Sequence, residues 1–151
     1  MAGIEKTGDW AAVEKMFAQA GEKLMTNVKR ATAQAGQTIV AEIEKRFQQE
    51  GPGWKSWSYA YALYRKRKFG GGKILSATGT LQKSAKFKPT GWDGGEVSML
   101  RRVGNVDLAW VHEFGTADGR IPPRPFFFPA VQAALPAIMK LYEEAVESAF
   151  K

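Results

Sequence analysis

"DWAAVEKMFAQAGEKLMTNVKRATAQAGQTIVAEIEKRFQQE", residues 9–50, is the stretch that decides the fold of this chain. Its apolar residues recur at steps of three or four: Trp10, Val13, Phe17, Ala20, Leu24, Val28, Ala31, Ala35, Ile39, Ile43 and Phe47. This spacing places side chains along one stripe of an α-helix. Asp9 is a good N-cap, and the Gly-Pro-Gly sequence at 51–53 stops the pattern. The stretch therefore predicts one amphipathic helical segment over residues 9–50.

The length of this segment leaves two arrangements open. Forty residues at about 1.5 Å each span roughly 60 Å, whereas a compact domain of this size has a diameter of roughly 40 Å. Gly21 and Gly36 are weak points, because each costs a helix about 1 kcal/mol relative to alanine. The segment is either one helix that overhangs its own domain or a hairpin broken at Gly36. An overhanging apolar stripe needs a cover, and a neighbouring copy is the simplest one.

The rest of the chain predicts a small antiparallel sheet and a second helix. "KFKP" at 86–89 and "EVSMLRRVG" at 96–104 flank the turn sequence "GWDGG" and predict a hairpin. "VDLAWVHEFG" at 106–115 is a strand or one to two helical turns. We expect a single α+β domain: an N-terminal tail (1–8), a long helix (9–50), a basic and aromatic loop region that is irregular or partly helical (51–74), a β-rich core (75–130) and a closing helix (131–151) packed on the sheet. Pro136 is expected to kink or delay that last helix.

The composition of the 151 residues excludes several classes of protein. The chain is 44% hydrophobic and 25% charged, which is typical of a globular domain. It has no cysteine and one histidine, which excludes disulfides, a thiolate nucleophile and a zinc site of the cysteine type. We expect no metal and no cofactor. The N-terminus does not resemble a secretory signal and no apolar run is long enough to cross a membrane, so we expect a cytoplasmic protein without membrane contact.

The net charge of +7 comes from the middle of the chain. Residues 55–102 hold eleven Lys or Arg against only Asp93 and Glu96. Within residues 54–73, five cations are interleaved with tryptophans and tyrosines: Arg65, Lys66, Arg67, Lys68 and Lys73. This mixture is typical of surfaces that bind nucleic-acid backbones and stack on bases. The alternative is a solvated loop that its aromatic residues anchor to the core.

His112 and Glu113 invite an interpretation as a proton-transfer pair. Adjacent residues, however, point to opposite faces of a strand and diverge by about 100° on a helix. The sequence also has no second histidine and no nucleophile elbow near this position. We therefore expect no enzyme. The alternative is that His112 packs or hydrogen-bonds inside the fold while Glu113 is solvated or paired.

"IPPRPFFFPA" at residues 121–130 predicts a stiff contact loop. Its prolines fix φ and remove backbone donors. Arg124 lies between two prolines, which suits a guanidinium aimed at a particular carboxylate or carbonyl cluster. Phe126, Phe127 and Phe128 cannot all face the same way in an extended segment, so at least one points away from the core. Arginine and aromatic residues on a rigid loop are typical of interface hot spots, and we predict that these four residues contact a partner.

Three motifs in order resemble the tail-completion proteins of tailed bacteriophages, also called the virion morphogenesis or minor tail protein family. The first is TGxLxxS, here Thr78, Gly79, Leu81 and Ser84. The second is a YAxxHxFGT-like element, here Ala109, His112, Phe114, Gly115 and Thr116, with Leu108 in the position of the tyrosine. The third is PxRPF, here Pro122, Arg124, Pro125 and Phe126. "GWKSWS" at 53–58 is similar to the tryptophan-bearing segment of that family.

The resemblance implies a non-enzymatic structural protein that completes the tail and joins it to the head as a ring, expected to be a hexamer. Its neighbours would be tail-terminator, tail-tube or head-connector proteins. It would occupy the host bacterial cytoplasm during assembly and the neck of the virion afterwards. A ring needs contacts between two different faces of the subunit. We expect the basic middle third to meet Glu143, Glu144 and Glu147 of an adjacent copy, and the same basic residues to face passing DNA.

Overall fold

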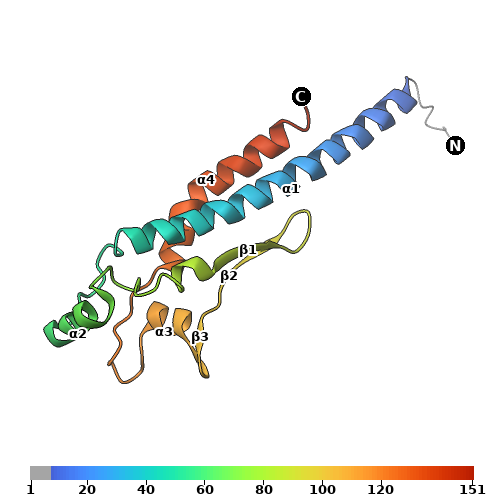
Figure 1. Ribbon diagram of the computed structural model, residues 1–151. Coiled ribbons are helices and arrows are strands. Elements are labelled where there is room, and N and C mark those ends of the chain that lie inside the picture. Colours follow the sequence, from blue (N-terminus) through green and yellow to red (C-terminus); the bar gives the residue numbers. More distant parts are fainter. Residues whose placement is uncertain (1–7) are drawn as a thin grey trace.

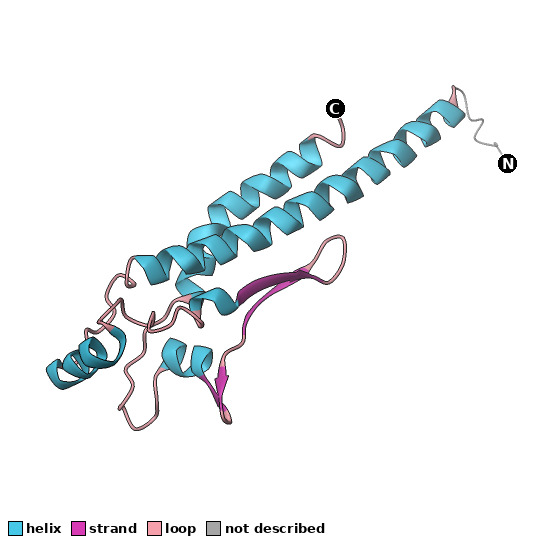
Figure 2. Cartoon of the chain, in the orientation of Figure 1, coloured by secondary structure: helices cyan, strands magenta, loops and turns pink. Residues whose placement is uncertain are grey.

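The computed structural model describes residues 8–151, and nearly the whole predicted N-terminal tail lies outside this range. Its elements are α1 (Trp10–Gln48), α2 (Tyr59–Phe69), the short 3₁₀ helix η1 (Gln82–Ser84), β1 (Ala85–Pro89), β2 (Gly95–Met99), β3 (Arg102–Val103), β4 (Val106–Asp107), α3 (Leu108–Phe114) and α4 (Phe127–Glu147). Figures 1 and 2 show a long helix, small antiparallel sheets and a C-terminal helix. The predicted α+β class is confirmed. Within residues 8–151, no helix combines the length and apolarity needed to cross a membrane.

Helix α1 is one continuous helix of 39 residues, roughly 58 Å long. The Asp9 carboxylate accepts the Ala12 N–H at 3.0 Å and caps its first turn, as the sequence predicts. The hairpin broken at Gly36 is therefore wrong. Gly36 has a different role, because the Phe87 ring of β1 occupies the space that a Cβ there would need. Gly36 lets the hairpin approach α1 closely.

Helix α4 packs antiparallel along α1 (Figure 1). Arg46 donates to Pro129 O at 3.1 Å, the hydroxyls of Thr32 and Tyr142 lie 2.8 Å apart, and Asn27 donates to Ala145 O at 3.3 Å. The packing partner of α4 is thus α1, whereas the sequence placed this helix on the sheet. The reason is that buried alanines on both helices allow a close approach. The helix also starts at Phe127 instead of 131 and continues through Pro136 without delay.

The predicted hairpin is confirmed as β1 and β2, which pair antiparallel from Ala85↔Met99 to Pro89↔Gly95. The predicted returning strand 96–104 is shorter than expected, because β2 ends at Met99. Residues 102–103 pair instead with β4 in a second small hairpin around a positive-φ glycine, Gly104. Residues 108–114 adopt the helical alternative, as α3.

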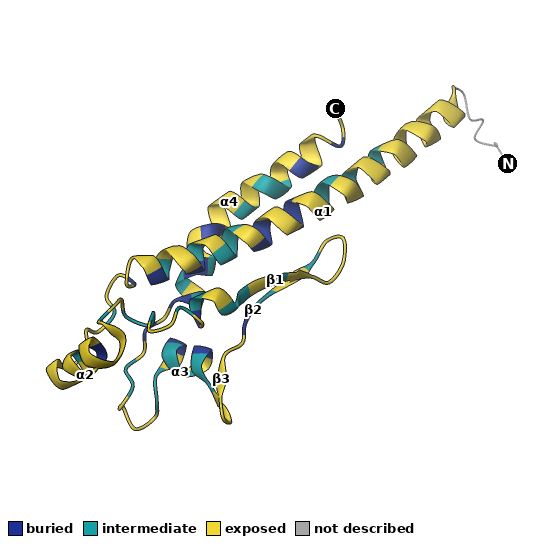
Figure 3. Ribbon diagram, in the orientation of Figure 1, coloured by how far each residue is buried: buried dark blue, intermediate teal, exposed yellow. Residues whose placement is uncertain are grey.

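The core lies where the C-terminal half of α1, the start of α4 and the hairpins meet. Its buried members are Ile43, Phe47, Leu81, Met99, Ala109, Phe126 and Ala130. The other end of α1 lies beyond the C-terminal end of α4 and is mostly exposed (Figure 3). Trp10 and Phe17, for example, are 47% and 62% exposed. Of the two arrangements that the sequence leaves open, the structure thus shows the one with an overhanging apolar stripe.

Candidate functional site

Two of the sequence motifs meet at the start of α4. Glu113, in the last turn of α3, is buried and directs its carboxylate at the backbone of the next motif. Its Oε2 accepts the N–H groups of Phe126 at 2.8 Å and Phe127 at 2.9 Å, and its Oε1 accepts that of Phe128 at 3.1 Å. The first N–H groups of a helix have no partner within the helix, and its N-terminus attracts negative charge. Glu113 therefore caps α4 from a distance in sequence.

The loop between the two motifs is held to α3 and to the turn that follows it by hydrogen bonds. His112 O accepts the Arg124 N–H at 2.7 Å, and Thr116 exchanges two hydrogen bonds with Ile121, each at 3.0 Å. Gly115 has φ 78° and ψ −176°, a region that essentially only glycine occupies. A Cβ on Gly115 would lie 2.8 Å from Ile121 O. These motif residues serve to close the proline-rich loop.

Arg124 and Phe126 act inside the subunit, which corrects their predicted place in a partner interface. Arg124 is 7% exposed, and its guanidinium donates through Nε and Nη2 to Lys55 O, at 3.1 and 2.9 Å. Phe126 is 1% exposed and packs on Phe47 with ring centroids 5.0 Å apart. Trp54 Nε1 donates to Pro125 O at 2.9 Å. The carbonyl that Arg124 binds belongs to its own chain, so the loop is tied to the segment that follows α1.

His112 and Glu113 do not form a proton-transfer pair. Within the described residues His112 Nδ1 is buried with no hydrogen-bond partner, and the Glu113 carboxylate faces the α4 backbone. Burial, and next the Arg124 charge, lower the pKa of His112 below its ordinary 6.5, which favours the neutral imidazole. The alternative that His112 packs inside the fold is thus confirmed, and Glu113 is paired with N–H groups. Residues 8–151 contain no group of three or more His, Cys, Asp or Glu that could hold a metal.

The predicted DNA-facing set divides into two parts. Arg65 is 3% exposed, lies over the Trp57 ring at 4.6 Å and donates to Lys73 O at 3.2 Å. Lys73 in turn donates through Nζ to Gln48 O. These two cations fasten α2 and the glycine-rich turn to the domain. The burial of Arg65 corrects its predicted DNA-facing role, whereas Lys73 is exposed and its predicted role stays a prediction. Three exposed cations remain on α2: Lys66, Arg67 and Lys68.

Exposed apolar groups lie beside the capped start of α4. Phe128 is 64% exposed and shares a hollow of about 370 Å³ with Trp110 and Phe114. The Trp110 and Phe114 rings lie 4.3 Å apart and both are exposed. Sequence reasoning missed Trp110. If residues 108–114 are read as a helix, Trp110 and Phe114 are four residues apart and therefore lie on one face of it, which would have indicated this pair. Phe127 is only partly buried against the core.

Comparison with known protein families agrees with the resemblance that the three motifs indicate. Residues 8–136 match the model of the phage virion morphogenesis family. The chain belongs to this family. An uncharacterized protein of Methanocaldococcus jannaschii is 31% identical over 115 residues, which cover 72% of this chain and 82% of that protein. No solved structure matches the chain.

In this family member the TGxLxxS motif forms the turn before β1. Leu81 is buried in the core, and Ser84 donates through Oγ to Leu81 O at 2.7 Å. Gly79 has φ +68°, and the hydroxyls of Thr78 and Thr80 lie 2.9 Å apart. Most residues of the three motifs therefore build the fold. Phe114 also presents a large apolar surface to solvent, since it is 60% exposed.

Proposed function

We propose that this chain is a structural, non-enzymatic component of a tailed phage or prophage particle. It completes the tail and joins it to the head as one subunit of a closed ring, located in the neck of the virion after assembly in the host cytoplasm. Family membership supports a role in morphogenesis. The observation that carries the proposal is the overhang of α1, where Trp10, Val13, Met16 and Phe17 are exposed. Apolar surface of this kind marks a contact site.

The charges of the subunit favour contacts between unlike faces. The cations of α2 lie at one end of the molecule, and the C-terminal end of α4 lies at the other (Figure 1). Glu143, Glu144 and Glu147 are exposed at that second end. A contact that joins two different faces of identical subunits closes into a ring when the rotation permits it. Opposite charges at the two faces would set the register of that contact.

The neighbours of the ring would be tail-terminator, tail-tube or head-connector proteins. Deletion of the gene from its phage or prophage tests this role. The deletion should yield filled heads and free tails that fail to join, or tails left unfinished, and the wild-type gene supplied in trans should restore infectious particles. His112→Asn is the matched control against an enzymatic role, because a folded variant should also restore them. Normal infectious particles from the deletion strain would refute the proposal.

A second proposal concerns DNA, and it is favoured by Lys66, Arg67 and Lys68 on the exposed side of α2. A ring at the head–tail joint surrounds the path of the genome, and these cations would face it without reading sequence. Replacing all three with serine should lower the slope of log K against log salt for random duplex DNA by about 2.7. A matched control replaces Lys15, Lys23 and Lys29 of α1, which should leave the slope unchanged. Absence of binding by the wild type at low salt would remove this second role.

A further inference from the structure

Helix α4 is unusual in the way its large and small side chains are distributed. Its face toward α1 combines small buried residues, Ala130, Ala134 and Ala145, with larger half-buried ones such as Tyr142, whose hydroxyl lies 2.8 Å from that of Thr32. Its outward side carries large apolar residues that are 46–64% exposed: Phe128, Leu135, Met139 and Val146. These four positions are separated by seven, four and seven residues, so they form one line along the helix. We call this line the outer stripe of α4.

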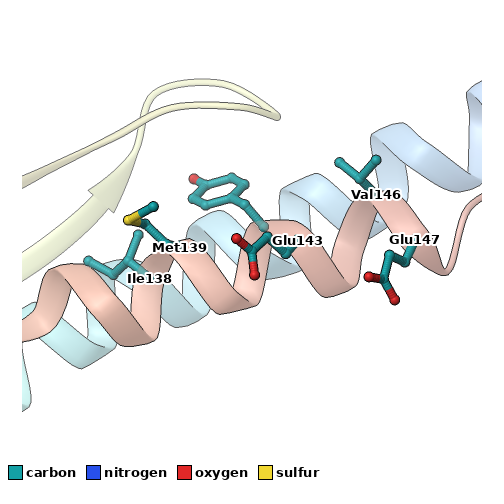
Figure 4. A pocket seen from close by; sticks show the side chains of 6 residues that line it. Ile138, Met139, Glu143, Val146 and Glu147 are labelled. Atoms are coloured by element: carbon teal, nitrogen blue, oxygen red, sulfur yellow. The ribbon is translucent and has the colours of Figure 1, made fainter.

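The outer stripe borders a shallow hollow on the surface. Figure 4 shows Met139 and Val146 beside Ile138, Glu143 and Glu147 on the outward side of α4. The hollow has a volume of about 560 Å³. Large apolar residues are usually buried in a folded protein. Four of them exposed along one line of α4 indicate that another element packs on the outer stripe.

The overhang of α1, residues 10–24, is the counterpart of this surface on the same chain. Its apolar positions continue the line that includes Ala31 and Ala35, which are buried where α1 packs against α4. The subunit's own α4 reaches only as far as Asn27, which donates to Ala145 O and to Ser148 Oγ. Helix α1 therefore presents a helix-packing face that extends roughly 21 Å beyond its partner.

We propose that the α1 overhang of one copy packs on the outer stripe of α4 in the next copy. This contact deepens the proposed ring and rests on it. The two surfaces match in length, since the outer stripe from Phe128 to Val146 spans roughly 27 Å and the overhang roughly 21 Å. The two surfaces together hold eight large apolar side chains that are 39–64% exposed. Burying them with a polar rim gives a contact near the lower limit of specific interfaces, roughly 1,200 Å².

A contact between unlike faces fits the subunit better than a two-fold contact. A two-fold pairing of overhangs would cover Trp10 and Phe17 but leave the outer stripe of both copies bare. One contact of overhang on outer stripe covers both surfaces, and each copy then offers both faces until the ring closes. To place the overhang of one copy on the outer stripe of the next, the next copy must be displaced along the α1 axis. This displacement also brings the acidic end of α4 in one copy toward the basic α2 of the next copy, so the charges favour the same arrangement.

The chain has no cysteine, so introduced thiols give an unambiguous test. Phe17 and Leu135 are 62% and 47% exposed, and cysteine at both positions should leave the fold intact. Under mild oxidation the full-length Phe17→Cys/Leu135→Cys chain should form a ladder of disulfide-linked multimers that ends at the closed ring. The single variants should give no dimers. An equimolar mixture of the two single variants should give dimers only.

A matched control variant carries Lys15→Cys with Leu135→Cys, because residue 15 lies on the opposite side of the overhang from Phe17. It should give no ladder. Dimers from Phe17→Cys alone would show a two-fold contact and overturn the proposal. Absence of any linked product up to about 1 mM protein, where even a weak contact is populated, would also overturn it. Rings that form without linkage at this pair would refute the contact and leave the proposed ring standing, whereas normal particles from the deletion strain would refute the ring itself.

Discussion

Loss of the Glu113 carboxylate should destabilise the protein more than loss of any exposed charge. In Glu113→Ala, three backbone N–H groups at the start of α4 lose a charged acceptor. A hydrogen bond to a charged group contributes about 1.5–3 kcal/mol, and a buried donor left without a partner costs about 1–3 kcal/mol. The Phe126 N–H is buried and the other two are partly buried, so water can replace only part of the loss. We expect a decrease of roughly 3–5 kcal/mol in the free energy of unfolding.

Urea denaturation followed by circular dichroism measures this loss directly, and the melting temperature should fall by roughly 10–15 °C. Glu113→Gln keeps the shape and one carbonyl oxygen but loses the charge, so it should cost about 1–3 kcal/mol. The matched control is Glu144→Ala on α4, where the carboxylate is 62% exposed and lies 3.8 Å from Lys140. That variant should stay within about 0.5 kcal/mol of the wild type. A loss below about 1 kcal/mol in Glu113→Ala would show that Glu113 does not cap α4.

Three further expectations concern single positions. Burial lowers the pKa of His112 in the folded protein below its ordinary 6.5, so the unfolded chain binds the proton at a higher pH than the folded chain does. The free energy of unfolding should therefore fall as the pH drops below 6.5, by at most about 1.4 kcal/mol per pH unit. Urea midpoints measured from pH 7.5 to 5 should depend less on pH in His112→Gln than in the wild type, and an equal dependence would contradict this reasoning. Gly115→Ala should lower the free energy of unfolding by about 2–4 kcal/mol in a denaturant titration, because the new Cβ would meet a loop carbonyl. Gly119→Ala, where the Cβ would meet open space, should lower it by about 1 kcal/mol. Equal losses in the two variants would argue against the close approach of the loop to Gly115. Gly21→Ala should stabilise the protein by about 0.5–1 kcal/mol and so raise the melting temperature. Gly36→Ala should lower the melting temperature, because its Cβ would meet the Phe87 ring. A higher melting temperature in both variants would show that the Phe87 ring moves aside without cost.

The elements that sequence reasoning predicted correctly are those built from local patterns. The three-to-four spacing of the residues 10–47 and the Asp9 cap predicted α1 with an error of two residues at its C-terminal end. The turn sequence at 91–95 predicted the β1–β2 hairpin. The helical character of 108–114 and the break of the returning strand after Met99 were left open or missed, because short segments satisfy either period and their partners decide between them.

The candidate site was predicted as a region but not in its roles. The motif containing Arg124 and Phe126 was identified as a rigid contact element, yet its contacts are inside the subunit. Phe128 is the phenylalanine of the three that is exposed most. Neighbouring residues of one type also differ in exposure in the basic segment, where Arg65 is buried and Lys66 is exposed. A residue type shows what a side chain is able to bind, while the packing determines whether the partner belongs to the same chain.

The sequence by itself determined that residues 9–50 form an amphipathic helical segment about 40 residues long, since periodicity and length are properties of the local chain. Whether this segment overhangs the domain or folds back at Gly36 was left open. Only the tertiary structure decided which part of its apolar stripe is bare, because this depends on where α4 ends opposite Asn27. The tertiary structure also decided that Glu113 caps a helix 13 residues away and that Arg124 binds Lys55 O, 69 residues away. Such pairings follow from the way the elements pack, and no local pattern in the sequence encodes them.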